Sequence, residues 1–187
     1  MISNTYSTST PHGGALVDRM LQGDARQDAQ RRAQTLTRIP LSPVNLSDLE
    51  LIAIGAYSPL TGFMNQGDYV SVVWEMRLTS GLVWSIPVTL AVTSDVAAGI
   101  REGQEVALCE GERPLAVMTV SEKYGYDKQQ EAGQVYRTTD EAHPGVARLY
   151  RQGDVLLGGN IWLFDRPSAM DIEFPDLRLT PTQARQA

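Results

Sequence analysis

The sequence predicts an α+β fold in which short β-strands form a small barrel or sandwich, with flanking helices and a helical N-terminal portion. Two observations support this fold class. Before Gly81, apolar residues recur at the three- and four-residue steps of helices. Beyond Gly81 the spacing becomes strand-like, and Gly and Pro residues separate several short runs of β-branched and apolar residues.

Three helices are expected in the N-terminal portion. The most distinctive follows Asp48, where the residues are apolar on nearly all sides, which predicts a buried helix. Ser47 and Glu50 have the spacing of a capping box at its start, and Gly55 can end it in a left-handed conformation. The other two helices are expected at 24–34 and 66–78, with an extended, proline-containing linker at 39–44.

The strands are expected after Gly81. The run 82–92 is β-branched and aromatic, and Pro87 within it indicates an edge or bulged strand. Two more strands, 105–109 and 115–122, flank a hairpin connection, and a last pair is expected to meet at the double glycine Gly158-Gly159. Shorter elements complete the prediction: helices at 94–100, 127–135, 146–150 and from Thr180 onward, and an extended segment at 174–179.

Composition excludes several classes of protein. The net charge is -6 and the basic residues are scattered, which argues against a nucleic-acid surface. No apolar run reaches membrane-spanning length, and the N-terminus has no basic region followed by an apolar core as in a secretory signal, so a cytoplasmic protein without membrane contact is expected. The single cysteine, Cys109, excludes an internal disulfide and a thiolate-rich zinc site, and its apolar neighbours predict a packed thiol.

Four separated motifs are the most informative part of the sequence. The first is DLELIAIGAYSPLTGFM at 48–64, and the second is PHGGALVDR at 11–19. The others are TTDEAHPGV at 138–146 and the GGNI element that begins at Gly158, with a further partial match at 69–78. Together and in this order, they are similar to the N-terminal domain of the ATP sulfurylase (sulfate adenylyltransferase) family.

The resemblance implies a fold, a domain organisation and a function. The fold is a PUA-like small β-barrel with flanking helices. The implied organisation is a disordered tail at 1–10, the PUA-like domain at 11–170, and the start of a linker or helix towards a missing catalytic domain at 171–187. The family's reaction converts ATP and sulfate to adenylyl sulfate and pyrophosphate, and its catalytic residues lie in a second, nucleotidyltransferase domain.

The motifs of that second domain are absent from these 187 residues. Neither Q-x-R-N-P-x-H-x-x-H, G-R-D-H-A-G nor a Walker-type phosphate loop occurs, and the two histidines are far apart. The expectation is therefore a scaffold without catalytic, cofactor-binding or metal-binding residues that is inactive alone. ATP and Mg²⁺ would be substrates of the full-length enzyme.

The expected partner is the catalytic domain, either in the same chain or as a split partner. The residues expected at the interface come from three of the motifs: Pro11, His12, Gly13, Gly14, Ser58, Pro59, Phe63, His143, Pro144 and Gly145. For both histidines the simpler interpretation is a turn residue bonded to backbone. Asp48, Glu50 and Asp140 are most simply helix caps and turn residues rather than an acid–base pair.

One position departs from the family pattern. Arg137 stands where the family has Gly. If that Gly serves a positive φ, Arg137 carries strain of about 1 kcal/mol. The alternatives are a different local backbone, or a Gly that serves close approach of another group.

Other functions stay open at this level. A free-standing PUA-like module that binds RNA is the alternative from a different class, although the acidic balance counts against it. A homo-oligomer is compatible with the sequence. The sequence does not distinguish a fragment from a natural split protein, and does not identify a bound ligand.

Overall fold

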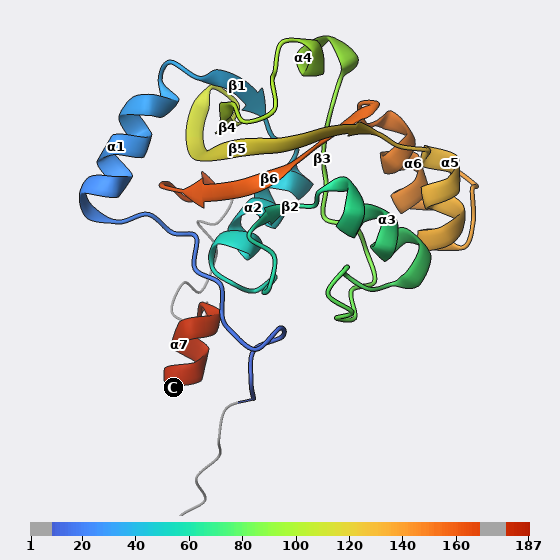
Figure 1. The fold of residues 1–187 in the computed structure, drawn as a ribbon, viewed down its shortest axis with the longest axis horizontal. Helices are drawn as coiled ribbons and strands as arrows, with labels where there is room; N and C mark the ends of the chain where they lie inside the picture. The colour runs from blue at the N-terminus through green and yellow to red at the C-terminus, as the bar shows by residue number, and fades with distance from the viewer. Residues whose placement is uncertain (1–8, 169–178) are drawn as a thin grey trace, which may run out of the picture.

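The computed structural model describes residues 9–168 and 179–187 (Figure 1). Its helices are α1 (Gly23–Ala33), α2 (Pro43–Ala53), α3 (Gln66–Glu75), α4 (Ser94–Ala98), α5 (Lys128–Glu131), the π-helix η1 (Ala132–Tyr136), α6 (Pro144–Arg151) and α7 (Pro181–Gln186). Its strands are β1 (Thr37–Pro40), β2 (Gly62–Phe63), β3 (Leu90–Val92), β4 (Glu105–Glu110), β5 (Arg113–Gly125) and β6 (Val155–Leu163). Residues 1–8 of the expected disordered tail and residues 174–178 of the expected extended segment lie outside the described residues.

The strands form one mixed sheet. Its order is β1-β4-β5-β6-β2, and β3 also pairs with β6. The β1–β4 pair is parallel, whereas the other pairs are antiparallel. The expected α+β class is confirmed, but the barrel is not, because the sheet of the described residues stays open. Closure requires hydrogen bonds between the two edges, and the edge strand β2 has only two residues.

Both faces of the sheet are covered. Val106 and Leu108 of β4 belong to the main core, which packs against α2 and α3. The alternate residues Ala107 and Cys109 point to the other face and pack against Ala29 and Ala33 of α1. Cys109 is fully buried there, which confirms the prediction of a packed thiol, and burial raises its pKa. Figure 1 shows α1 at one end of the molecule and α5 and α6 at the other.

The helix that carries the first motif begins earlier than predicted. Its cap is Ser42, whose Oγ accepts a hydrogen bond from the Asn45 N–H at 3.2 Å, so the proposed cap at Ser47 is wrong. Pro43 occupies the first helical turn, where its missing N–H costs nothing. The predicted linker therefore divides into β1 and the start of α2. Gly55 follows the helix with φ +82°, which confirms the predicted left-handed end.

Two strand predictions are wrong. Of the run 82–92 only Leu90–Val92 is a strand, and the rest is a loop. The double glycine does not join two strands, because β6 runs straight through it. A Cβ on Gly159 would lie 2.0 Å from the Thr119 carbonyl oxygen, and one on Gly158 would lie 2.4 Å from Asn65 Oδ1. Gly159 therefore permits close packing against β5 and Gly158 permits close packing against Asn65, and neither forms a turn between strands.

The departure at Arg137 has a definite geometry. Arg137 adopts a left-handed backbone, with φ 59° and ψ 19°, directly after η1. A positive φ is therefore kept at the position where the family has Gly, and the alternative of a different local backbone is not what the structure shows. The predicted helix 127–135 is correspondingly a short α-helix, capped by Asp127 as expected, that continues as a π-helix.

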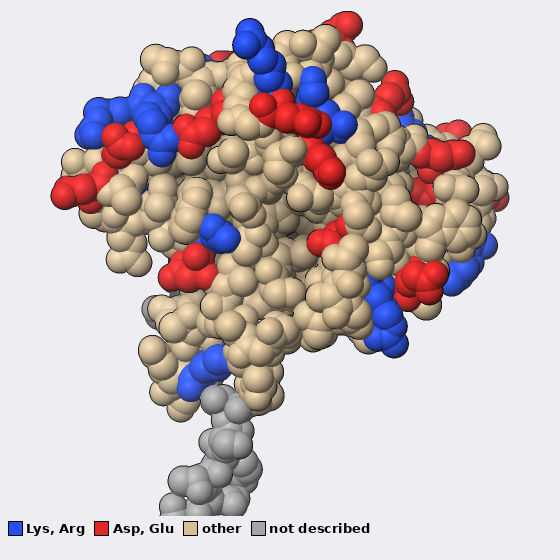
Figure 2. Space-filling model, viewed as in Figure 1, with Lys and Arg blue, Asp and Glu red and all other residues tan. Residues whose placement is uncertain are grey.

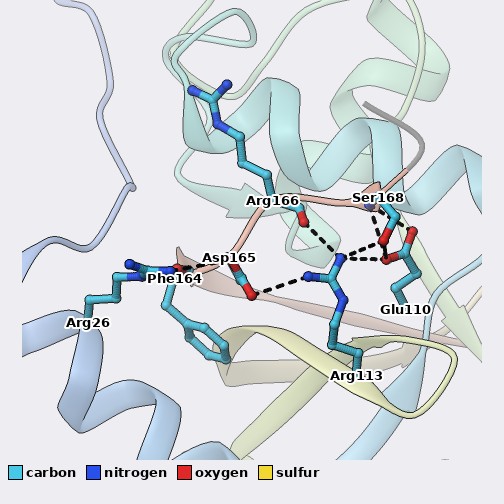
Figure 3. A network of polar contacts seen from close by, with 7 residues as sticks. All are labelled: Arg26, Glu110, Arg113, Phe164, Asp165, Arg166 and Ser168. Atoms are coloured by element: carbon cyan, nitrogen blue, oxygen red, sulfur yellow. Dashed lines mark hydrogen bonds and ion pairs between the residues drawn. The ribbon is translucent and has the colours of Figure 1, made fainter. Parts of the chain in front are cut away.

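A polar network fastens the chain where it leaves β6 (Figure 3). Arg113, at the start of β5, donates to Glu110 at 2.7 Å, to Asp165 at 3.2 Å and to Ser168 Oγ at 2.9 Å. Arg26 of α1 donates from Nε to the Phe164 carbonyl at 2.7 Å. The bonds from Arg113 and Ser168 lower the pKa of the Glu110 carboxyl to about 2. The network ties the segment after β6 to the β4–β5 hairpin and α1.

Candidate functional site

The first motif and the PHGG segment are in contact in the structure, although the bonded residues Val17 and Ser58 are more than 40 positions apart in the sequence. The Val17 N–H donates to Ser58 Oγ at 2.9 Å, and Ser58 Oγ donates to the Gly55 carbonyl at 2.7 Å. A Cβ on Gly13 would lie 2.9 Å from Pro59 Cβ. With its φ of +79°, Gly13 lets the backbone lie directly on the proline. The peptide bond between Ser58 and Pro59 is cis.

Beside this junction lies a cleft of about 600 Å³. Its walls come from five separate parts of the chain: the PHGG segment, α2, residues 56–58, the loop between α3 and β3, and α6. The residues with functional chemistry in it are His12, Asp48, Tyr57, Trp84 and Arg148. None of these except His12 was among the predicted site residues.

Aromatic rings form one side of the cleft. The Tyr57 ring meets the Trp84 ring edge to face, with centroids 5.7 Å apart, and the His12 ring lies 6.2 Å from Trp84. His12 Nε2 donates to the Val83 carbonyl at 3.0 Å, and Trp84 Nε1 donates to the Ile86 carbonyl at 2.9 Å. These bonds fix the orientation of both rings. They also confirm the interpretation of His12 as a residue bonded to backbone.

Asp48 supplies a carboxylate in the same cleft. It lies within α2 and is half-buried, and burial raises its pKa to about 6, against an opposing effect of Arg148. Burial also raises the pKa of the Tyr57 hydroxyl, and the Asp48 charge adds to that effect. Among the residues that the structure describes, no donor lies within hydrogen-bonding distance of the Asp48 carboxylate. The expectation that Asp48 is a helix cap is therefore wrong.

A second acidic group lies close to this cleft. A smaller hollow of about 40 Å³ is lined by Asp48 and Arg148 together with Glu131. Glu131 is only 6% exposed and accepts a hydrogen bond from the Tyr69 hydroxyl at 2.8 Å. Burial raises its pKa, while the Tyr69 bond and Arg148 oppose the increase. Arg148 itself is exposed and forms no hydrogen bond or ion pair within the described part of the chain.

The remaining predicted residues lie elsewhere. Phe63 is 3% exposed in the core, so its side chain is not part of the surface. His143 caps α6, where its Nδ1 accepts the Gly145 N–H at 3.2 Å, and its ring lies 5.0 Å from that of Tyr136. The turn interpretation of His143 is confirmed. Asp140 is likewise a turn residue that accepts the Ala142 N–H at 2.9 Å.

The structure thus brings together Pro11, His12, Gly13, Gly14, Ser58 and Pro59, but not Phe63 or the group His143, Pro144 and Gly145. Sequence reasoning assigned Asp48 to a helix cap and did not predict Tyr57, Trp84 or Arg148 as site residues. For Asp48 a signal existed, because Val44 and Asp48 are four residues apart and share a helix face that lines the cleft. For Arg148 no local pattern indicates that α6 lines the same cleft as α2.

Two other kinds of feature are absent from the described residues. No group of three or more His, Cys, Asp or Glu side chains is placed to hold a metal ion there. No helix in that part of the chain is long and apolar enough to cross a membrane.

Comparisons with known proteins identify the fold family. Residues 9–166 match the family described as PUA-like domain. A sulfate adenylyltransferase of Symbiobacterium thermophilum is 57% identical over 94% of this chain, and one of Nostoc punctiforme is 47% identical over 99% of it. The matches cover 44% and 47% of those relatives, so the chain spans less than half of their length.

A solved structure agrees with these matches. A hexameric APS kinase from Thiobacillus denitrificans superposes with a TM-score of 0.70 at 28% sequence identity, over 94% of this chain and 30% of that one. The chain belongs to the PUA-like domain family and matches the N-terminal portion of sulfate adenylyltransferases.

Proposed function

We propose that the chain acts as the N-terminal domain of a sulfate adenylyltransferase, which converts ATP and sulfate to adenylyl sulfate and pyrophosphate. Its role is to dock and position a catalytic nucleotidyltransferase portion, supplied in the same chain or as a split partner. ATP and Mg²⁺ bind to that portion, and the 187 residues alone are inactive. The observation that carries the proposal is the 57% identity to a sulfate adenylyltransferase over 94% of the chain.

The docking face in this proposal is the rim of the 600 Å³ cleft. Val83 and Ile86 on this rim are 58% and 53% exposed, and Val44, which also lines the cleft, is 38% exposed. Large apolar side chains gathered at one surface favour contact with another protein segment. The PHGG segment and Ser58-Pro59 border the same face, as the sequence motifs predicted for an interface. Self-association and a contact through His143–Gly145 remain predictions.

The proposal is tested with a chimera. This chain replaces the matching 44% of the Symbiobacterium thermophilum relative, and pyrophosphate release from ATP and sulfate is measured. We expect turnover by the chimera within about tenfold of the relative, and background release by the chain alone. Turnover by the chain alone contradicts the assignment of catalysis to another portion. A folded but inactive chimera contradicts the scaffold role.

Binding of RNA is the competing function. Figure 2 shows Lys and Arg side chains interspersed with Asp and Glu on the face in view, without an extended basic area. A protein that binds RNA through its backbone concentrates positive charge and aromatic side chains on one surface. A gel shift with structured RNA at low salt is expected to show no complex. A tight, salt-sensitive complex would restore this alternative.

A further inference from the structure

The cleft contains an acidic group, Asp48, that forms no hydrogen bond or ion pair with the described residues. The Asp48 carboxylate is half-buried, and its pKa is raised to about 6 chiefly by that burial. A carboxylate removed from water is stable only if it is protonated or paired. Neither an ion pair within 4.0 Å nor a hydrogen bond to Asp48 is present among residues 9–168 and 179–187. The charge of Arg148 only partly offsets the effect of burial, so a second cation placed against Asp48 would stabilise its ionised form.

The walls around this carboxylate favour one class of ligand. Trp84 and Tyr57, held at 5.7 Å, and His12 present aromatic surface to the same cleft. Aromatic faces attract cations, and guanidinium groups in particular stack on them. A cleft that contains both a carboxylate and aromatic rings is thus complementary to a guanidinium or ammonium group at the end of an apolar stem. The exposed Val83 and Ile86 on the rim offer contact for such a stem.

We infer that the cleft accepts an arginine or lysine side chain of the polypeptide that docks on this face, with the cation paired to Asp48 and its stem against Trp84 and Tyr57. That the polypeptide is the catalytic portion rests on the proposed function, whereas the chemistry of the pocket does not. A volume of about 600 Å³ exceeds what one side chain fills, so neighbouring residues of the partner enter as well.

The charged groups around Asp48 set its response to pH. Arg148 of α6 lines the same cleft and lowers the pKa of the Asp48 carboxyl, and it also opposes the raised pKa of Glu131. Tyr57 lies near the Asp48 charge and His12 lies at the rim. Arg148 competes with an incoming cation through its own positive charge, but it forms no ion pair with Asp48. Binding of a cation is therefore expected to strengthen as the pH rises through about 6, where Asp48 ionises.

The test uses the isolated chain and a small probe. N-acetyl-L-arginine methylamide is titrated while the Trp84 indole N–H and nearby amides are followed by NMR, and the neutral isostere N-acetyl-L-citrulline methylamide serves as the ligand control. We expect saturable shifts with the arginine probe at a Kd of about 1–10 mM, and at least about tenfold weaker binding of the citrulline probe. Equal binding of the two probes, or no saturable shift up to about 100 mM, overturns the inference.

Three variants complete the test. Asp48→Asn is expected to weaken binding about tenfold or more and to remove its pH dependence, while the amide spectrum shows that the fold is kept. Glu141→Gln, which removes one exposed charge outside the cleft, is expected to bind as the natural chain does. Arg148→Gln is expected to strengthen binding a few-fold because a competing cation is removed.

The opposite result for Arg148→Gln has a definite meaning. Loss of arginine binding in this variant, or shifts of the same signals by sulfate that depend on Arg148, would show an anion site and overturn the inference. Because these measurements need only the isolated chain, they can fail while the chimera of the proposed function remains active, and the reverse also holds.

Discussion

At the residue scale, two positions show how backbone conformation determines the free-energy cost of placing a side chain there. Arg137 keeps a left-handed φ of 59°, which is one of the three alternatives that the family motif left open at this position. Gly159 combines a φ of +153° with a carbonyl oxygen 2.0 Å from where its Cβ would be. The first position tolerates a side chain at a cost, and the second has no space for one.

Arg137→Gly is expected to stabilise the fold by roughly 0.5–1 kcal/mol. Relief of left-handed strain contributes about 1–2 kcal/mol, and the greater entropy of Gly in the unfolded chain offsets about half of it. The side chain of Arg137 gives up only an exposed 3.4 Å contact with Gln134. Urea unfolding measures the difference. As a control, Ala147→Gly inside α6 should lose about 1 kcal/mol, and a loss of stability at position 137 would show that the arginine is not strained.

Gly159→Ala is expected to destabilise the fold by about 2–3 kcal/mol, because the Thr119 carbonyl and the Ser121 amide must shift to admit a methyl group. Gly125→Ala is the matched control, since nothing lies within 4 Å of the position that its methyl group would take and it sits at the end of the same strand pair. It is expected to change stability by less than about 1 kcal/mol. Thermal unfolding of both variants measures the difference in stability. An equal loss of stability in the two variants would contradict the packing argument.

At the element scale, the sequence predicted helices better than strands. The helices α1, α3 and α6 lie close to the predicted ranges 24–34, 66–78 and 146–150, because the composition and residue spacing that predict a helix are local. The loop 82–89 has the composition of a strand, yet it pairs with no strand among the described residues and instead forms a wall of the cleft. Its β-branched residues Val83 and Ile86 are exposed at that wall rather than buried in the sheet.

The network around Arg113 gives a prediction about pH. The folded pKa of Glu110, about 2, is below its ordinary value of 4.5, so its ionised form stabilises the fold. This contribution is complete above pH 4.5 and is lost as the pH falls towards 2. In Arg113→Met, NMR titration should therefore show the Glu110 pKa rising towards 4.5. A titration that stays near 2 in this variant would mean that Ser168 alone holds the carboxylate.

The same variant should also unfold differently with pH. Its deficit in unfolding free energy relative to the natural chain is expected to be largest near neutral pH and to shrink as Glu110 becomes protonated. The deficit should be small, since Glu110 and Arg113 are partly exposed and solvent screens such pairs. A deficit independent of pH would assign the effect to lost packing of the arginine stem.

At the scale of the whole molecule, the sequence predicted the family and the fold class but not the site. Motifs at both ends of the chain identify the family, because each motif can be recognised locally and the motifs occur in the same order as in the family. The cleft depends on long-range packing: Asp48 and Arg148 are 100 positions apart, and no local pattern indicates that they meet. The open sheet was missed for a similar reason, since closure depends on the length and position of edge strands rather than on their composition.

The central claim is that this chain contributes a docking face rather than catalytic groups. Hydrogen–deuterium exchange of the active chimera, compared with the isolated chain, tests it most directly. The account predicts slower exchange in the chimera at the amides of 56–58, 83–86 and 88, which border the cleft, and unchanged exchange in α1 at one end of the molecule. Slower exchange confined to α1 and β1, with the cleft unaffected, would contradict it.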